Sequence, residues 1–365
     1  MKPQFEIRKA TNEDSSLLIE LLKNTHQEGK IHLNFEREPN YFHATMVSTN
    51  LPEVWVMEDN HNSKLAAVFS IGKRQVYING AKHWVRYGND LRIHSDYQGG
   101  RTLYRLFKKY RELMQSDWMQ TVILEDNNVS ISTVSSGRLI LPTYYQYGKI
   151  VTHIIDIKKN ITPLSDNSIR RANSEDVLMM QAFFDQHAPN KQFYPHYNFS
   201  KIGTRDPYYK DIKIENIFLS FKEDRLQGIC GIWDQKQFKQ TRFMGYAGAM
   251  KLLRHINNLA KKILGGIYLP KPGEKANYVI LHSLLCESND GHVFIGLLAA
   301  IQQAYRKSQY DAISLGLDER DPLNYFCGDL KGIRLKSNHY LASYDSDPTK
   351  GLDSSLLFYP EIARL

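Results

Sequence analysis

Apolar positions recur at helical spacing directly after two nearly identical polar segments. Residues 7–14 read IRKATNED and residues 169–176 read IRRANSED, with five identical positions. In each copy a short strand pattern leads through a polar turn into an amphipathic helix. The apolar positions of these helices are Leu17, Leu18, Leu21 and Leu22 in the first copy, and Leu178, Met179, Ala182 and Phe183 in the second. We therefore expect one fold to occur twice.

Both copies also carry a helix-start signal. Thr11 and Asn173 stand three residues before Asp14 and Asp176, a spacing typical of N-cap residues whose partner acid faces the exposed amides. Two such junctions can arise by chance, but their separation is that of a whole domain. We expect a first domain at 1–158, a linker at 159–168 and a second domain at 169–365, each with its own sheet.

Alternating and apolar runs predict the remaining elements. In the first half we expect a helix near 41–47 and strands at 54–56, 65–71, 80–94, 118–124 and 150–157. In the second half we expect strands at 215–221, 226–234, 278–286 and 311–317, helices over 293–306 and from 321, and a final strand within 356–365. The fold class is α/β with a mixed sheet.

The segment from Asp90 to Phe107 reads as a strand, a glycine turn and a helix. Glycines at 99 and 100 let the backbone approach a ligand closely, and the amides that open the following helix point outward with the positive end of its dipole. Such a junction can hold a pyrophosphate, although a plain strand-to-helix turn has the same pattern.

Composition limits the functional classes. The chain has 365 residues, 42% hydrophobic residues, a mean hydropathy of −0.46 and a formal net charge of +8, with 39 acidic residues interspersed among 47 basic ones. We expect no nucleic-acid partner, because no long basic arm is present. No apolar run reaches the ~20 residues of a membrane span, so we expect no membrane partner. Three scattered cysteines indicate neither disulfides nor a metal site, and we therefore expect a reducing, cytoplasmic location.

The order of elements, IRKATNED and the segment LRIHSDYQGGRTLYRLF resemble the GNAT superfamily of acyl-CoA N-acyltransferases. Gln98 falls on the first position of the family's glycine signature, whereas Arg101 and Leu103 occupy two later positions where the family has small residues. Asn127 falls where members often have an Asn that contacts the coenzyme. Val134 stands where many members carry the Tyr that protonates the leaving thiolate.

The resemblance implies two tandem GNAT-like domains and acetyl-CoA, or a related acyl-CoA, as cosubstrate. It implies that the backbone at Leu91, Ile93 and Ser95 pairs with the pantetheine arm and that one amide there polarises the thioester carbonyl. It implies a pyrophosphate site at Gln98, Gly99, Gly100, Arg101 and Thr102.

Acid and base candidates remain open. His94 lies at the end of the coenzyme strand and has a suitable intrinsic pKa, although strand alternation turns it away from Ile93. Tyr144 and Tyr145 can supply the acid that Val134 cannot, or serve only as aromatic wall residues. In the second half, Glu287 is the best base, with a solvated carboxylate as its alternative.

These observations predict an acyl-CoA-dependent N-acetyltransferase in which an amine of a small molecule or a protein attacks the thioester directly. Two alternatives stay open: a noncatalytic acyl-CoA sensor or scaffold, and catalysis in the C-terminal half. The sequence leaves the acceptor and the oligomeric state undetermined.

Overall fold

The two halves of the chain follow the same order of helices and strands. The computed structural model describes residues 4–27, 29–264 and 266–365. The first half comprises β1 (Phe5–Lys9), α1 (Ser15–Lys23), β2 (Ile31–Glu36), α2 (Tyr41–Ser48), β3 (Val54–Asp59), β4 (Lys64–Ile78), β5 (Ala81–Ile93), α3 (Gly100–Met114), β6 (Met119–Leu124), α4 (Asn128–Val134) and β7 (Thr143–Asp156). The second half comprises β8 (Ser168–Arg171), α5 (Val177–His187), β9 (Ile217–Lys222), β10 (Arg225–Trp233), β11 (Gln240–Tyr246), α6 (Met250–Leu264), β12 (Tyr278–Cys286), α7 (Gly291–Tyr305), β13 (Ala312–Asp318), α8 (Leu323–Phe326) and β14 (Gly332–Ser343). Apart from β2 and α2 in one half and β11 and α6 in the other, each half runs strand, helix, three strands, helix, strand, short helix and long strand.

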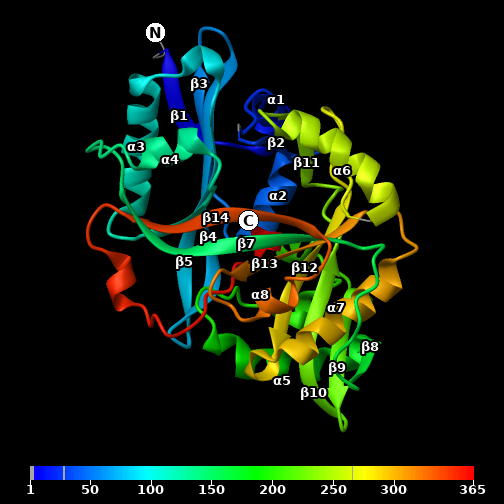
Figure 1. Cartoon of the computed structure of the whole chain (residues 1–365). Helices are drawn as coiled ribbons and strands as arrows, with labels where there is room; N and C mark the ends of the chain where they lie inside the picture. Colours follow the sequence, from blue (N-terminus) through cyan, green and yellow to red (C-terminus); the bar gives the residue numbers. More distant parts are fainter. Residues whose placement is uncertain (1–3, 28, 265) are drawn as a thin grey trace.

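Strands from both halves join one sheet (Figure 1). The sheet has 12 strands in the order β1-β3-β4-β5-β6-β14-β7-β13-β12-β10-β9-β8, and β2 pairs with β11 in a separate ribbon. Parallel and antiparallel pairs both occur, so the predicted mixed sheet is confirmed. The expectation that each half has its own sheet is wrong.

The exchange of the two longest late strands explains this continuity. β7 pairs with β13 of the second half, and β14 pairs with β6 of the first half. β7 and β14 also pair with each other, from Gly332 opposite Ile155 to Ser343 opposite Thr143. Each strand thereby covers a sheet edge that would otherwise expose unpaired N–H and C=O groups.

The last ten residues do not form the predicted final strand. They run as an irregular segment with a short 3-10 turn at Ile362–Arg364, near the centre of the molecule (Figure 1). The Arg364 guanidinium donates to the carbonyl oxygens of Val47 and Tyr208, at 2.7 and 2.9 Å. The segment therefore contacts both halves through Arg364, and its backbone forms a single bridge with Gln192. The last strand of the sheet along the chain is β14.

The two predicted helix starts share one arrangement. The carboxylate of Asp14 accepts from the N–H of Thr11 at 2.7 Å, and that of Asp176 accepts from the N–H of Asn173 at 2.8 Å. Arg8 donates two bonds to Asp14, at 2.7 and 2.8 Å. Arg170 donates two to Asp176, at 2.6 and 2.7 Å. In both pairs the arginine lowers the pKa of the aspartate by hydrogen bonding to its charged form.

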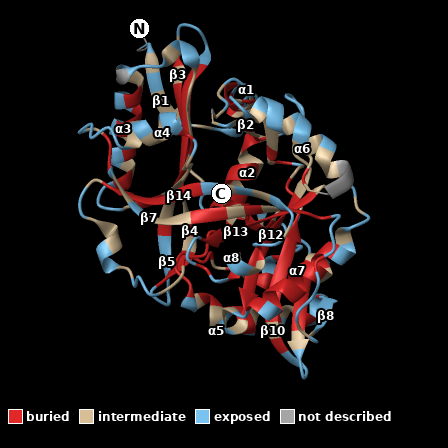
Figure 2. Cartoon of the chain, viewed as in Figure 1, coloured by how far each residue is buried: buried red, intermediate tan, exposed pale blue. Residues whose placement is uncertain are grey.

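The larger apolar core belongs to the second half. It joins α5 and α7 to β9, β10, β12 and β13, and α7 is buried along most of its length (Figure 2). A smaller cluster in the first half packs Leu106, Phe107 and Tyr110 of α3 against Phe69 and Met119. The apolar face of α3 therefore packs against a smaller cluster than α7 does. Part of that face lines a cavity.

Candidate functional site

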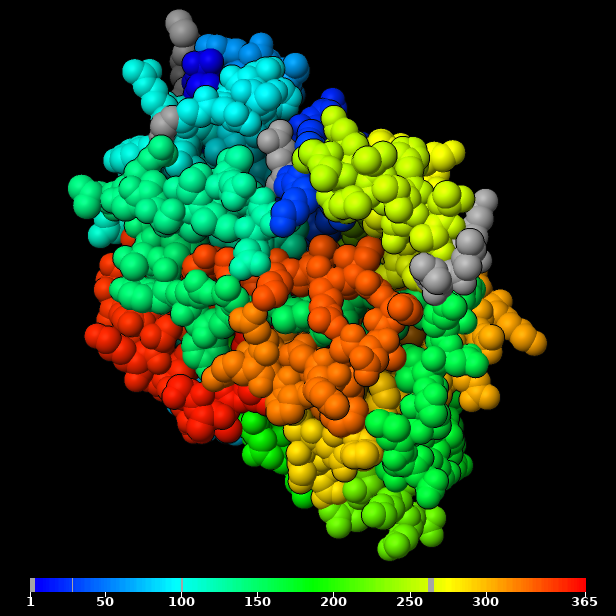
Figure 3. Space-filling view, viewed as in Figure 1, coloured from blue at the N-terminus to red at the C-terminus, as the bar shows by residue number. Residues whose placement is uncertain are grey.

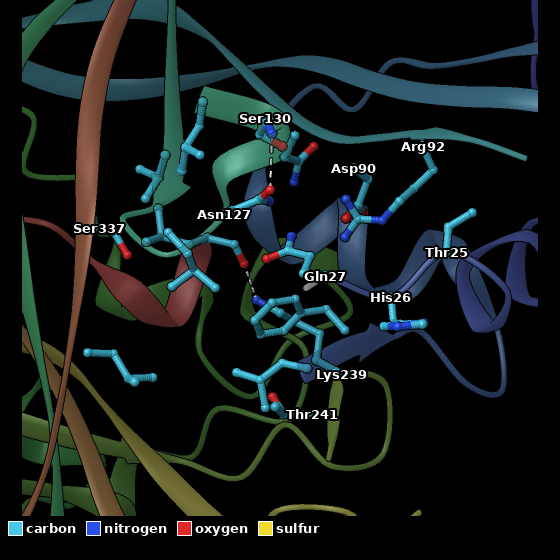
Figure 4. A pocket seen from close by; sticks show the side chains of 18 of the residues that line it. Thr25, His26, Gln27, Asp90, Arg92, Asn127, Ser130, Lys239, Thr241 and Ser337 are labelled. Carbon is cyan, nitrogen blue, oxygen red and sulfur yellow. Dashed lines mark hydrogen bonds between the residues drawn. The ribbon is translucent and has the colours of Figure 1, made fainter. Parts of the chain in front are cut away.

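A cavity of about 1360 Å³ opens where β5 and β6 separate (Figure 4). The two strands pair in parallel only at Arg86 with Met119 and at Tyr87 with Gln120. Beyond those pairs, residues 88–93 of β5 and 121–124 of β6 line the cavity. The opposite wall comes from the second half, at residues 235–243 and 267–278. The cavity therefore lies between the two halves and offers room for two reactants.

A bulge in β5 aims backbone groups at this cavity. Asp90 has a φ of 50°, and the pairing of β5 with β4 shifts register between Val68 and Ser70. A bulge leaves backbone groups outside the ladder and bends the strand. The predicted residues Leu91, Ile93 and Ser95 all line the cavity, and so do Gln98 and Gly99.

The glycine turn leaves the start of α3 open. Gly99 has a φ of 144°, and no heavy atom lies within 4 Å of the place where a side chain would begin. No side chain caps the helix, which begins at Gly100. Arg101 and Thr102 lie in its first turn, Arg101 exposed to solvent, and neither lines the cavity. The N-terminal amides and the helix dipole can therefore meet an anion at this end.

The equivalent helix start in the second half is closed. Asp290 caps α7 by accepting from the N–H groups of His292 and Val293 at 2.7 and 3.4 Å. Gly291 is buried, and the ring of Phe326 would lie 1.8 Å from a Cβ at this position. A carboxylate and an aromatic ring thus occupy the place where α3 is open.

The corresponding bulge of the second half, at Ser283 in β12, has its backbone groups bonded to side chains. We call each bulged strand, with the backbone groups that it turns out of the sheet, a strand opening. Ser283 has a φ of 46°, as in the β5 bulge, but its N–H donates to the Glu361 carboxylate at 2.8 Å. The N–H of Leu284 donates to the Tyr359 hydroxyl at 3.1 Å, and its carbonyl accepts from the Tyr194 hydroxyl at 3.0 Å. Side chains of this chain therefore satisfy the backbone groups that a ligand would use.

Other residues named from the sequence lie around the first cavity. Asn127 is buried, lines the cavity and accepts from the N–H of Ser130 at 3.1 Å (Figure 4). Val134 lines it too and has no proton to donate. Tyr144 lines the cavity, and burial raises the pKa of its phenol, which stays protonated at neutral pH.

Three predicted acid or base candidates do not line this cavity. The imidazole of His94 accepts from the N–H of Asp96 at 3.2 Å, just beyond β5. Tyr145 alternates with Tyr144 and so points to the other face of β7. Glu287 forms an ion pair with Arg225 in the second half. None of these three side chains belongs to the lining of the cavity.

The cavity also holds a charged group that was not predicted as part of a site. The carboxylate of Asp90 accepts from Arg37 at 3.2 Å and from the Tyr41 hydroxyl at 3.3 Å, and both charged side chains are buried. Arg92 lies beside them, and burial lowers the pKa of its guanidinium. Asp90 and Arg37 lie 53 residues apart, so no local sequence pattern predicts that they form a pair.

Lys239 brings an ionisable amine to the same cavity. It precedes β11, lines the cavity and donates to the backbone oxygen of Leu365 (Figure 4). Burial, together with the nearby positive charge of Arg37, lowers the pKa of this amine to about 7. A substantial fraction of Lys239 is therefore uncharged at neutral pH and able to accept a proton.

The described residues contain no group of three or more His, Cys, Asp or Glu side chains placed to hold a metal ion. Cys230, Cys286 and Cys327 are buried free thiols, and burial raises the pKa of Cys286 to about 12. Within the described ranges, no helix combines the length and apolarity needed to cross a membrane.

Comparison with known proteins gives structural matches alone. No protein-family model matches the sequence, and no curated protein matches it. N-myristoyltransferase from Saccharomyces cerevisiae with bound myristoyl-CoA matches with a TM-score of 0.58 and 9% identity, over 98% of this chain and 89% of that one.

Two N-acetyltransferases match as well. A GCN5-related N-acetyltransferase from Sphaerobacter thermophilus has a TM-score of 0.53 and 11% identity, over 95% of this chain and 98% of that one. Another from Anabaena variabilis ATCC 29413 has a TM-score of 0.50 and 11% identity, over 93% of this chain and 73% of that one. Over most of its length, this chain has the fold of the GCN5-related N-acetyltransferases and of N-myristoyltransferase.

Proposed function

We propose that this protein is an acyl-CoA-dependent N-acyltransferase and that its donor binds between β5 and β6. One observation carries the proposal: both halves contain a bulged strand, a glycine and a helix start, but those of the first half face a cavity. In the second half the same features are bonded to Tyr359, Glu361 and Asp290. The matched folds belong to N-acyltransferases, which supports the same class.

The donor would lie along the first half of the cavity. Backbone groups at Leu91 and Ile93 would pair with its pantetheine arm, because β5 separates from β6 beyond Tyr87 and this edge of the strand lines the cavity. The turn Gln98–Thr102 and the amides that open α3 would take the pyrophosphate. Asn127 would complete the contact from the start of α4.

The residues around the cavity support a direct transfer. The nitrogen of the acceptor forms a bond to the carbonyl carbon of the thioester, and the carbon–sulfur bond breaks. A backbone amide near Ile93 would stabilise the developing oxyanion. Uncharged Lys239 would take the proton that the amine loses, and the Tyr144 hydroxyl would protonate the leaving thiolate.

Lys239 takes the base role here because His94 and Glu287 lie outside the cavity. It stands on the wall contributed by the second half, where the acceptor amine would enter. Acetyl-CoA is the first donor to test, and the acceptor is an amine of a small molecule or a protein.

A noncatalytic acyl-CoA sensor is the second candidate. Val134, which lines the cavity without a hydroxyl, favours it. Calorimetric titration of the full chain with acetyl-CoA, followed by thiol release with a panel of amines, separates the two functions. Binding with amine-dependent thiol release supports the enzyme. Binding without release across the panel supports the sensor, and absence of binding to acetyl-CoA and longer acyl-CoAs contradicts both.

A further inference from the structure

Polar residues of helix α6 face the protein, whereas its large apolar residues at 252–259 are exposed. Figure 2 shows much of this helix as exposed or half-buried. The amide of Asn258 exchanges two bonds of 2.9 Å with the backbone of Leu269, and Asn257 donates to the carbonyl of Ile267 at 2.8 Å. Arg254 donates to the Leu269 carbonyl at 3.3 Å. These residues recur at helical spacing, so they fix one face of α6 against the segment that follows it.

The opposite face of α6 carries a continuous apolar stripe. Leu252, Ile256 and Leu259 are 67%, 53% and 68% exposed, and Leu253 beside them is 48% exposed. Spacings of three and four place the first three on one line along the helix. Among the described residues, each other helix or strand carries at most one exposed large hydrophobic side chain. An amphipathic helix of a soluble domain normally buries this stripe, so the stripe indicates a contact surface.

The charges of α6 are all of one sign. Its sequence MKLLRHINNLAKKIL contains Lys251, Arg254, Lys261 and Lys262 together with His255, and no Asp or Glu. Lys251 and His255 are exposed. A short helix with an apolar stripe and basic residues matches the requirements of an interfacial helix on an anionic surface.

The same helix borders the candidate active site. Ile267 and Leu269, to which its polar face is bonded, line the cavity between β5 and β6. In the space-filling view α6 forms the yellow-green ridge on one side of the molecule (Figure 3). The helix that carries the apolar stripe is therefore bonded to one wall of the cavity.

We propose that α6 docks the protein on an anionic lipid surface, with its apolar stripe in the headgroup region and the exposed side chains of Lys251 and His255 facing lipid phosphates. A second copy of the chain fits this face less well, because two basic helices would meet in a protein of net charge +8. The proposal concerns contact with a lipid surface and departs from the sequence-based expectation of no membrane partner. It stands apart from the proposed activity, since lipid binding needs neither donor nor acceptor.

Vesicle co-sedimentation of the full chain tests this proposal. We expect binding to vesicles of phosphatidylcholine with phosphatidylglycerol, weak or absent binding to pure phosphatidylcholine, and weaker binding as salt rises. The variant L252S/I256S/L259S should lose at least tenfold in vesicle affinity. Its melting temperature should not fall, because the replaced side chains are exposed.

Leu178→Ser is the matched control, since Leu178 is 83% exposed on α5 in the other part of the fold. It should bind vesicles as the parent does. Three outcomes would overturn the proposal: no binding to anionic vesicles, undiminished binding of the triple variant, or a concentration-dependent dimer that the triple variant abolishes. The last outcome would assign the stripe to a second copy.

Discussion

The two strand openings of this molecule share one geometry and differ in what meets their backbone groups. In the first half, the bulge at Asp90 and the glycine turn face a cavity of about 1360 Å³. In the second half, the bulge at Ser283 is bonded to Glu361, and the following residue to Tyr359. The comparison teaches that a fold presents a potential site at each such opening, and that the side chains packed into it decide whether a ligand can enter.

The largest loss of stability should follow from removing the positive charge near Glu361, the residue that is bonded to the bulge at Ser283. Arg364 is fully buried, donates to Val47 and Tyr208, and stacks 3.5 Å from the ring centre of Tyr208. Arg364→Met should lower the free energy of unfolding by about 3–5 kcal/mol, because it leaves Glu361 buried without its neighbouring positive charge.

Chemical denaturation measures this loss. The control is Arg334→Met, whose exposed guanidinium also donates to backbone carbonyls and whose loss should stay below about 1 kcal/mol. Equal losses of unfolding free energy in the two variants would show that the buried charge of Arg364 stabilises the fold no more than the exposed charge of Arg334 does.

The next effect concerns proton transfer in the first opening. Lys239→Met should lower kcat about 100-fold, or about 2.7 kcal/mol in activation free energy. In the parent, kcat should rise with pH through about 7, because the uncharged amine is the active form. The variant should lose that rise.

Lys149→Met, which alters a lysine paired with Glu125 outside the cavity, is the control for the loss of a positive charge. It should keep both the rate and the pH profile of the parent. An unchanged pH profile in Lys239→Met would remove this residue from the mechanism.

A smaller effect should follow from closing the glycine turn. The double variant Gly99→Val with Gly100→Val should weaken acetyl-CoA binding at least tenfold, or about 1.4 kcal/mol, because side chains would cover the amides that open α3. Gly203→Val introduces the same side chain at another open glycine with φ of 79° and controls for backbone strain. Titration calorimetry measures both. If affinity is equal in the two variants, the pyrophosphate does not lie at this turn.

The smallest effects test the likeness of the two halves. Asp14→Asn and Asp176→Asn should each lower stability by about 1 kcal/mol, since each removes an equivalent capping carboxylate. The paired arginines lower both aspartate pKa values, so this stability is present above the unfolded value of about 3.9 and is lost as pH falls through the folded pKa. Denaturation at several pH values checks this. A clear loss in one half alone would mean that the two junctions are not equivalent.

Local patterns allowed much of the fold to be predicted. The two capped helix starts depend on residues within one turn, and the strands at 118–124 and 278–286 lie close to β6 and β12. The glycine turn was found for the same reason, because Gly99 stands beside the residues that it connects. Hydrophobic periodicity and capping patterns both depend on residues that are close together in the sequence.

The features that depend on contacts between residues far apart in the sequence could not be predicted. The insertion of β14 between β6 and β7 depends on residues about half a chain apart, so separate sheets were expected. The pairing of Arg37 with Asp90, and the position of Lys239 near them, likewise arise from tertiary packing. The strand prediction for residues 356–365 was wrong. Their apolar side chains pack in the core beside β12, but their backbone forms no strand of the sheet.

Hydrogen–deuterium exchange of the full chain with and without acetyl-CoA tests whether the donor binds in the first half. We expect slower exchange on binding at residues 90–103 and 127–130, with residues 283–295 unchanged, because only the cavity between β5 and β6 would hold the donor. Slower exchange at residues 283–295, with residues 90–103 unchanged, would contradict the assignment of the site to the first half.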